Sequence, residues 1–270
     1  MADTSSQFAG SIPALYDRCM GPIMFQPYAD DLSRRVAAQI AEGSVLETAC
    51  GTGILTRRLR ERLAPNVRLV ATDLNQPMID HARASVQAAS AIEWQRVDCT
   101  AMPFEPASFG AVVCQFGMMF PPDKTAAVRE ARRVLAPGGL FAFSTWDGLD
   151  GNPYADAIRQ AVASFFPSDP PQFFTVPYGF NDPAFWRDLL ATNGFVDVQH
   201  EVVELEARSE MAATLATGLI QGSPLSHEIL ARGGNLDEIV EAATAALVRL
   251  GGDAPFVSVS HALVFTARAG

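Results

Sequence analysis

The 270-residue sequence contains a single lysine, Lys124, and carries a net charge of −10 at neutral pH. A surface that binds nucleic-acid phosphates needs clustered lysine and arginine side chains, so this charge balance argues against DNA or RNA as a partner. No apolar stretch reaches the roughly 18 residues that a membrane-spanning helix requires. The first residues show neither the basic start nor the apolar segment of a secretory signal. We therefore expect a globular protein with no nucleic-acid partner and no membrane span.

Cysteine is also scarce, and the four that are present show no Cys-x-x-Cys spacing: Cys19, Cys50, Cys99 and Cys114. Three of them fall at or next to predicted strand ends, which favours reduced thiols in a cytoplasmic protein over disulfides or a metal site. A catalytic Cys50 is conceivable, because a thiol at a helix start can have a lowered pKa. The sequence favours the other interpretation, in which Cys50 is a small residue that packs in a loop.

Hydrophobic residues make up 49% of the chain and charged residues 19%. This composition suits one large α/β domain with an appended cap and is too apolar for a disordered chain.

The chain is organised around a glycine-containing loop in residues 45–59. Val45 to Glu47 read as a buried strand, Gly51 and Gly53 as a tight turn, and the residues from Ile54 onward as a helix. Glycine allows a ligand to approach the backbone closely, and a helix start offers unpaired N–H groups and a positive dipole end. The loop predicts a cradle for an anionic group of a nucleotide-type cofactor, although such turns also occur in α/β folds that bind nothing there.

Strands and helices alternate after this loop. Further strands are predicted at 67–72, 92–97, 109–115 and 140–146, with helices between them. Such alternation is typical of a parallel sheet with helices on both faces, whose binding site lies beyond the carboxyl ends of the strands. Polar side chains stand at four of these ends: Glu47, Asp73, Asp98 and Gln115.

Both ends of the chain fall outside this alternation. Residues 8–42 predict two helices separated by Gly21-Pro22; the first, which ends near Tyr16, could be a lid over a ligand or could cover a sheet edge. A proline- and aromatic-rich insertion covers 148–181, a sixth strand about 196–206, and helices continue to Leu250 before a last strand at 256–267. The aromatic insertion suits a lid over an apolar ligand, although ordinary packing of a cap explains it nearly as well.

Four motifs, in order and spacing, resemble the class I S-adenosylmethionine-dependent methyltransferases. They are Leu46-Glu47-Thr48-Ala49-Cys50-Gly51-Thr52-Gly53, Ala71-Thr72-Asp73-Leu74-Asn75-Gln76-Pro77-Met78, Val97-Asp98-Cys99-Thr100-Ala101-Met102-Pro103-Phe104 and Arg133-Val134-Leu135-Ala136-Pro137-Gly138-Gly139-Leu140. The resemblance is greatest to the branch that includes the ubiquinone/menaquinone-biosynthesis methyltransferases, and it covers about 45–146. It implies a Rossmann-like, seven-stranded, mostly parallel sheet with helices on both faces and a helical cap, whose last two strands are antiparallel neighbours.

The resemblance also implies S-adenosyl-L-methionine as the cofactor and gives each motif a role. Glu47 would hold the ammonium side of the methionine moiety, Asp73 both ribose hydroxyls, and Asp98 the adenine amine. The full set of implied cofactor-binding residues is Tyr16, Glu47, Ala49, Gly51, Gly53, Asp73, Leu74, Met78, Asp98, Cys99 and Gln115. Ala49 departs from the glycine that is usual at the first loop position, and we expect binding to survive this change.

We expect methyl transfer to a small lipophilic acceptor, aromatic or quinone-like. The candidate acceptor-site residues are Trp146, Tyr154, Phe174 and Tyr178. No catalytic residue is assigned; the four histidines, His81, His200, His227 and His261, are candidates for a base only by their chemistry. An in-line displacement from a sulfonium needs a base only when the acceptor is a hydroxyl or a carbon acid.

Two other functions remain open at this point. A nicotinamide-dependent oxidoreductase uses the same type of sheet, but Ala49 and Thr56 stand where its pattern has glycines. A cofactor-binding interaction protein without catalysis would carry the same motifs, since none of them contacts an acceptor. The expected divisions are a helical lid at 1–42, the cofactor-binding core at 43–147, cap insertions at 148–181 and 207–254, a core helix and strand at 182–206, and the last strand at 255–270.

Overall fold

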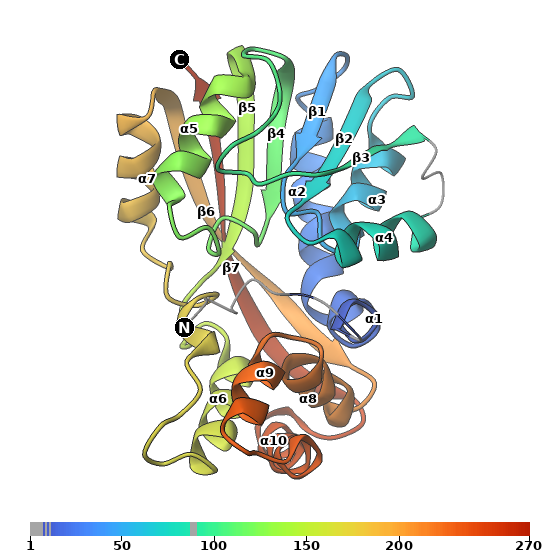
Figure 1. Cartoon of the computed structure of the whole chain (residues 1–270), viewed down its shortest axis with the longest axis vertical. Helices are drawn as coiled ribbons and strands as arrows, with labels where there is room; N and C mark the ends of the chain where they lie inside the picture. Colours follow the sequence, from blue (N-terminus) through green and yellow to red (C-terminus); the bar gives the residue numbers. More distant parts are fainter. Residues whose placement is uncertain (1–7, 9, 11, 87–90) are drawn as a thin grey trace.

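The computed structural model describes residues 8, 10, 12–86 and 91–270. Seven strands form one sheet in the order β3-β2-β1-β4-β5-β7-β6 (Figure 1). The strands are β1 (Ser44–Glu47), β2 (Arg68–Asp73), β3 (Glu93–Arg96), β4 (Phe109–Gln115), β5 (Leu135–Trp146), β6 (Phe195–Ser209) and β7 (Phe256–Ala269). β1 pairs in parallel with β2 and β4, whereas β7 runs antiparallel to both of its neighbours. The predicted seven-stranded, mostly parallel sheet is confirmed.

Helices cover both faces of this sheet, because successive residues of each strand enter two different cores. On one face, Val45 and the strand residues that point the same way pack beneath α2 (Gln26–Ala37) and α3 (Ile54–Arg62). On the other face, Leu46 and the strand residues that point the same way pack beneath α5 (Lys124–Val134) and α7 (Pro183–Thr192). Strands that are buried on both faces read as continuous apolar runs, as β4 does in the sequence. α4 (Gln76–Ser85) connects β2 to β3.

The strand order reverses between β1 and β4, the strands that carry Glu47 and Gln115. From β1 the chain proceeds outward through β2 and β3, and it then returns to the other side of β1 with β4. Loops leave this point in opposite directions and open a crevice beyond the carboxyl ends of the strands. The topology therefore brings the ends of β1, β2 and β4 to one place.

The helical segment before β1 differs from the two predicted helices. α1 (Ile12–Leu15), a π-helix, η1 (Tyr16–Phe25), and α2 follow one another without a break, so the predicted interruption at Gly21-Pro22 is wrong. Pro22 lacks an N–H and would leave a gap in the hydrogen bonding of an α-helix, whereas the wider π-helical turn accommodates it. Gly21 lets this helix approach the start of α3: a Cβ at Gly21 would lie 3.2 Å from Ile54 Cδ1.

The cap lies below the sheet in Figure 1 and consists of segments that are far apart in sequence. α6 (Pro153–Ser164) follows β5, and α8 (Ala212–Gln221), α9 (Leu225–Ala231) and α10 (Leu236–Gly251) lie between β6 and β7. The far ends of β6 and β7 remain paired as far as Ser209 and Phe256, which extends the sheet into the cap. The expected division after residue 206 therefore falls inside β6.

Two smaller differences concern β5 and β3. β5 begins at Leu135 rather than residue 140, because Leu135 pairs with Phe109 before a register shift. β3 covers Glu93–Arg96 only. All four cysteines are free thiols. Among the described residues, none of the helices combines the length and apolarity that crossing a membrane requires.

Candidate functional site

The loop after β1 adopts a left-handed backbone at three positions. Ala49, Gly51 and Gly53 have φ values of 52°, 54° and 82°. A Cβ at Gly51 would meet no atom within 4 Å, so this glycine faces open space at the crevice. Gly53 differs: its Cβ would lie 2.8 Å from Val86 Cγ2, and the residue faces the interior beside α4. The structure thus places Gly51 at the crevice wall and makes Gly53 a support for the turn.

Ala49 stands where a glycine was expected, and the structure shows how its methyl group is accommodated. The Ala49 Cβ lies against Gly117, where an added Cβ would come within 2.4 Å of it and within 2.6 Å of Cys114 Sγ. Gly117 therefore provides the space that the Ala49 side chain fills. An alanine after β1 is thus matched by a glycine after β4, and the two loops can pack closely together.

Asp73 anchors the loop from the end of β2. Its Oδ2 accepts from the Gly51 N–H at 2.9 Å, and its Oδ1 accepts from the Asn75 N–H at 2.8 Å and the Asn75 side-chain amide at 3.3 Å. Burial raises the pKa of this carboxyl, and the N–H donors of Asn75 and Gly51 oppose that rise. A carboxylate has about four lone-pair sites, so Oδ2 keeps capacity for another donor. Two ribose hydroxyls would require the Asn75 amide to give way.

Glu47 ends β1 and is 1% exposed. Its Oε2 is buried and has no hydrogen-bond partner in the structure. Burial raises the pKa of the carboxyl to about 8; Thr56 opposes the rise, and nearby Asp73 adds to it. A buried acid with an unpartnered oxygen suits a site that a cationic group completes.

A cavity of about 230 Å³ opens at the reversal of strand order. Nine of the residues that were expected to bind the cofactor line this cavity: Tyr16, Ala49, Gly51, Asp73, Leu74, Met78, Asp98, Cys99 and Gln115. Glu47 does not line this cavity. It lines a smaller polar cavity of about 30 Å³, which shares Tyr16, Ala49, Gly51 and Gln115 with the first.

Asp98 and Gln115, at the ends of β3 and β4, are held by different contacts. Asp98 is exposed, and its Oδ1 accepts from the backbone N–H and the hydroxyl of Thr100 at 2.8 and 2.7 Å. Gln115 donates from Nε2 to the Phe25 carbonyl at 2.7 Å. The end of β4 is thereby tied to the N-terminal helical segment.

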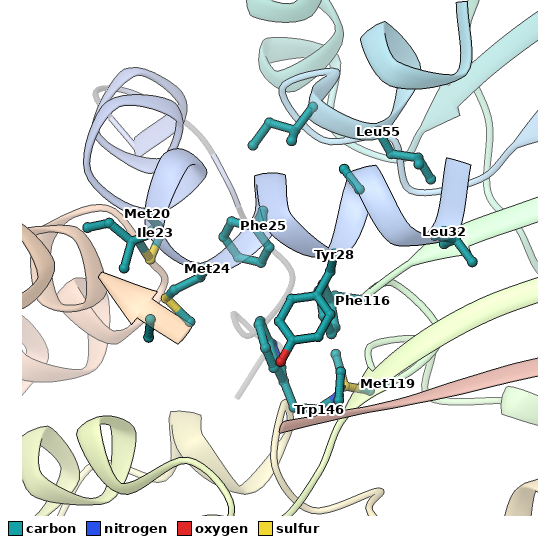
Figure 2. Packing of buried hydrophobic residues seen from close by; sticks show 14 of the residues in the cluster. Met20, Ile23, Met24, Phe25, Tyr28, Leu32, Leu55, Phe116, Met119 and Trp146 are labelled. Carbon is teal, nitrogen blue, oxygen red and sulfur yellow. The ribbon is translucent and has the colours of Figure 1, made fainter. Parts of the chain in front are cut away.

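A third, apolar cavity of about 60 Å³ lies between the sheet and the cap and shares Phe8, Tyr16, Phe116 and Phe120 with the large one. Its wall includes Trp146, Phe174 and Tyr178, three of the expected acceptor-site residues. Figure 2 shows Phe25, Phe116 and Trp146, which also line this cavity, packed together with Tyr28. The Phe116 and Trp146 rings stack with centroids 3.7 Å apart.

Tyr154 is the exception among the four expected acceptor-site residues. It is fully buried, lines none of these three cavities, and its hydroxyl lies 3.2 Å from Ser260 Oγ and 3.4 Å from Asn152 Oδ1. The first turn of α6 directs this ring into the core between cap and sheet. The structure thus assigns Tyr154 to packing and corrects the expectation that it lines the acceptor site.

Tyr16 lines all three cavities and stacks on Phe25 with centroids 4.7 Å apart. The next residue, Asp17, accepts from the Thr52 hydroxyl at 3.1 Å and lies 3.4 Å from the His81 ring. The N-terminal helical segment is thus joined directly to the glycine loop and to α4. This position agrees with the lid interpretation of the segment; residues 1–7 lie outside the described residues.

The histidines lie away from the cavities. His261 contacts Glu204 at 3.0 Å, His200 stacks on Phe265, and none of the four lines any of the three cavities. Several cavity residues were not anticipated, chiefly Phe8, Asn75 and the segment Phe116–Pro122. The rule that sites lie beyond strand ends could have indicated 116–122, because this segment directly follows β4.

The comparisons with known proteins agree with this geometry. Residues 45–139 match the family model of a methyltransferase domain. This stretch is a class I methyltransferase domain. A demethylmenaquinone methyltransferase of Deinococcus radiodurans is 41% identical over 119 residues, which cover 44% of this chain and 47% of that protein. A 2-phytyl-1,4-naphtoquinone methyltransferase of Thermosynechococcus vestitus is 30% identical over 55% of this chain and 65% of its own length.

The chain spans about half the length of curated relatives that it matches, 53% of a demethylmenaquinone methyltransferase of Lactococcus lactis and 47% of the Deinococcus radiodurans protein. Solved structures extend the likeness of fold to 90–95% of the chain. Phosphoethanolamine N-methyltransferase 2 of Haemonchus contortus, in complex with S-adenosyl-L-methionine, has a TM-score of 0.58 at 16% identity, covering 95% of this chain and 56% of that one. The YcgJ protein of Bacillus subtilis has a TM-score of 0.58 over 90% of this chain and 98% of its own. The resemblance read from the four motifs is confirmed.

Proposed function

We propose that the protein transfers a methyl group from S-adenosyl-L-methionine to a small lipophilic acceptor. The observation that carries the proposal is the meeting, at Tyr16, of an apolar cavity with a crevice where the side chains of Asp73 and Asp98 gather at strand ends. The methyltransferase domain supports the cofactor class, and the apolar cavity supports the acceptor class.

The residues present fit the cofactor. Gly51 leaves open space where a side chain would intrude, and Glu47 presents a buried, unpartnered carboxyl oxygen to which an ammonium group supplies the missing partner. Asp73 holds hydroxyl groups of the ribose, while Leu74 and Met78 provide apolar contact for the adenine. Gly53 supports the loop from behind.

When bound, S-adenosylmethionine supplies an activated methyl group on a sulfonium whose departure needs no acid. The protein's own contribution is to align the cofactor with the acceptor and to enclose both of them. Four side chains line both the crevice and the apolar cavity, so they border the path that the methyl group crosses: Phe8, Tyr16, Phe116 and Phe120. Positioning of this kind is worth roughly 7–11 kcal/mol in favourable intramolecular reactions.

The oxidoreductase alternative is not favoured, because the matched domain and the curated relatives are methyltransferases. The non-catalytic alternative predicts cofactor binding without turnover of any acceptor. The apolar cavity adjoining the crevice favours catalysis, because a closed acceptor site would leave no such space.

The test is calorimetric titration of the purified protein with S-adenosylmethionine, S-adenosylhomocysteine and NAD in parallel, after mass spectrometry for ligand carried through purification. We expect micromolar binding of both adenosyl compounds and none of NAD. Binding of NAD alone, or of none of the three, would refute the proposal.

A further inference from the structure

The apolar cavity is lined almost entirely by carbon and sulfur. Its lining residues are Phe8, Tyr16, Met20, Met24, Phe25, Phe116, Phe120, Trp146, Phe173, Phe174, Pro177, Tyr178, Leu219 and Ser223. Within this described lining there is no acid, histidine, lysine or arginine. The only side chains that bear a proton on oxygen are Tyr16, Tyr178 and Ser223.

None of these three hydroxyls suits the role of a base. Ser223 donates to the Leu219 carbonyl at 2.6 Å and accepts from the Leu225 N–H at 3.3 Å, so it is engaged within its own helical turn. Burial raises the pKa of Tyr178 well above its usual value. Burial also raises the pKa of Tyr16, and Asp73 and Asp17 add to the rise. Both phenols therefore stay protonated at neutral pH.

The titratable groups next to the apolar cavity but outside its lining do not supply a base either. Tyr28 donates to the Ser260 carbonyl at 2.6 Å, and burial raises its pKa; burial raises the pKa of Tyr154 to about 12. Asp147 and Glu204 lie on the far side of Tyr28 and contact His261. Glu47, Asp73 and Asp17 lie on the cofactor side of Tyr16.

We propose that the acceptor is a small, uncharged thiol that supplies its own nucleophile, and this inference rests on the proposed function. The thiol loses its proton to solvent before transfer. The thiolate lone pair forms the new S–CH₃ bond while the bond from the methyl carbon to the sulfonium breaks, and its electron pair returns to the departing thioether. Atoms and charge balance, because one anion and one cation become two neutral molecules.

Two properties of the cavity select sulfur over oxygen, and a third favours the transfer itself. Without a base, a sulfur or oxygen acceptor must ionise by itself, and a thiol is a stronger acid than the alcohol or phenol with the same carbon skeleton; the thiol of cysteine has a pKa of about 8.5. Met20, Met24 and the aromatic rings offer the polarisable contacts that sulfur prefers. An apolar wall also favours a reaction in which opposite charges neutralise, because the separated charges are poorly solvated there.

The size of the cavity points to a small molecule. At about 60 Å³ it is well below the roughly 150 Å³ of an engineered apolar cavity that binds benzene. A short alkyl thiol fits this space, whereas an aromatic thiol requires Phe173, Phe174 and Tyr178 to move outward. A naphthoquinone with a phytyl tail, the type of substrate in the name of one relative, exceeds it.

The experiment pairs each thiol with its oxygen analogue: propanethiol with propanol, and thiophenol with phenol. Methylated products are measured by mass spectrometry across pH 5.5–9.5, a range of about four pH units chosen around the cysteine pKa. We expect each thiol to exceed its oxygen analogue at least 100-fold in kcat/KM. We also expect thiophenol methylation to level off within this range and propanethiol methylation to keep rising to its upper end, because a simple alkyl thiol is a weaker acid than cysteine and thiophenol is a stronger one. One common midpoint for both thiols would reveal an enzymic base and overturn the proposal.

Binding supplies a readout independent of turnover. Trp146 lines the cavity, so propanethiol should quench tryptophan fluorescence of the protein saturated with S-adenosylhomocysteine, and the Trp146→Phe variant should lose most of that change. Leu219→Trp fills the cavity and should weaken thiol binding more than tenfold with cofactor affinity unchanged. Leu219→Met conserves volume and is the matched control. Ser223→Ala and Tyr178→Phe should leave both pH profiles in place.

The outcomes separate the two proposals. Cofactor binding with no thiol binding or methylation overturns the thiol assignment and leaves the proposed function standing. Preferred methylation of phenol or propanol also overturns it. Failure to bind either adenosyl compound refutes the proposed function and the thiol assignment with it.

Discussion

The cofactor crevice and the apolar cavity adjoin each other but are built in different ways. The crevice is made by the ends of β1, β2, β3 and β4, and most of its side chains come from short segments that directly follow a strand. The apolar cavity is made by η1, the end of β5, the segment around Phe173–Tyr178 and α8, which are far apart in the chain. A site at strand ends follows from topology, whereas a site under a cap depends on how separate segments pack.

The largest expected effect tests the crevice at Glu47. Its raised pKa of about 8, against 4.5 ordinarily, means that the folded protein holds a proton that the unfolded chain loses. This contribution to stability is fully present below about pH 4.5 and is lost as pH rises through about 8. Glu47→Gln should therefore match the parent near pH 4.5 and exceed it near pH 9 by at most about 5 kcal/mol.

Thermal unfolding of both proteins across this pH range measures the difference. Equal pH dependence of the two proteins would show that Glu47 is ionised in the ligand-free fold. Saturating S-adenosylhomocysteine should reduce the advantage of the variant, because its ammonium group compensates the carboxylate.

The second effect concerns Asp73, which serves both the loop and the cofactor. Asp73→Ala removes acceptors for Gly51 and Asn75 as well as for the ribose. We expect cofactor affinity to fall about 100-fold, which corresponds to about 2.7 kcal/mol. Calorimetry measures the loss, and Asp98→Ala at the exposed end of the crevice is the comparison. An affinity within threefold of the parent would contradict the ribose assignment.

The third effect tests the contact between Ala49 and Gly117. Gly117→Ala would bring two Cβ atoms within 2.4 Å, so we expect a loss of about 1–3 kcal/mol in the free energy of unfolding. Gly110→Ala within the preceding strand, β4, is the control, because its nearest contact would be 3.5 Å. The double variant Gly117→Ala with Ala49→Gly should recover part of the loss. Denaturant unfolding tests this, and strictly additive effects would disprove the contact.

The smallest effect separates packing from acceptor binding in the cap. Tyr154→Phe removes a buried hydroxyl from Ser260 and Asn152 and should cost about 1 kcal/mol of stability. Since Tyr154 lines none of the three cavities, propanethiol binding should remain within twofold of the parent. A large loss of thiol binding at unchanged stability would show that Tyr154 is part of the acceptor site.

The sequence by itself determined the fold of residues 45–146 and the residues that approach the crevice. Alternating strands and helices specify a parallel sheet, and in such a sheet Glu47, Asp73, Asp98 and Gln115 must lie at one edge. Boundaries were less accurate at β5 and before β1, where a register shift and a π-helix depend on neighbouring segments.

Tertiary structure decided which aromatic side chains face the apolar cavity and which fill the core. Trp146, Phe174 and Tyr178 line it, whereas Tyr154 turns into the interior, although all four are aromatic residues near the end of β5 or in the cap. It also decided that Ala49 is tolerated, because the space for its methyl group is provided by Gly117, which is 68 residues away in the chain. Local sequence specifies the turn or helix, but the direction of a side chain in the assembled fold depends on contacts between distant segments.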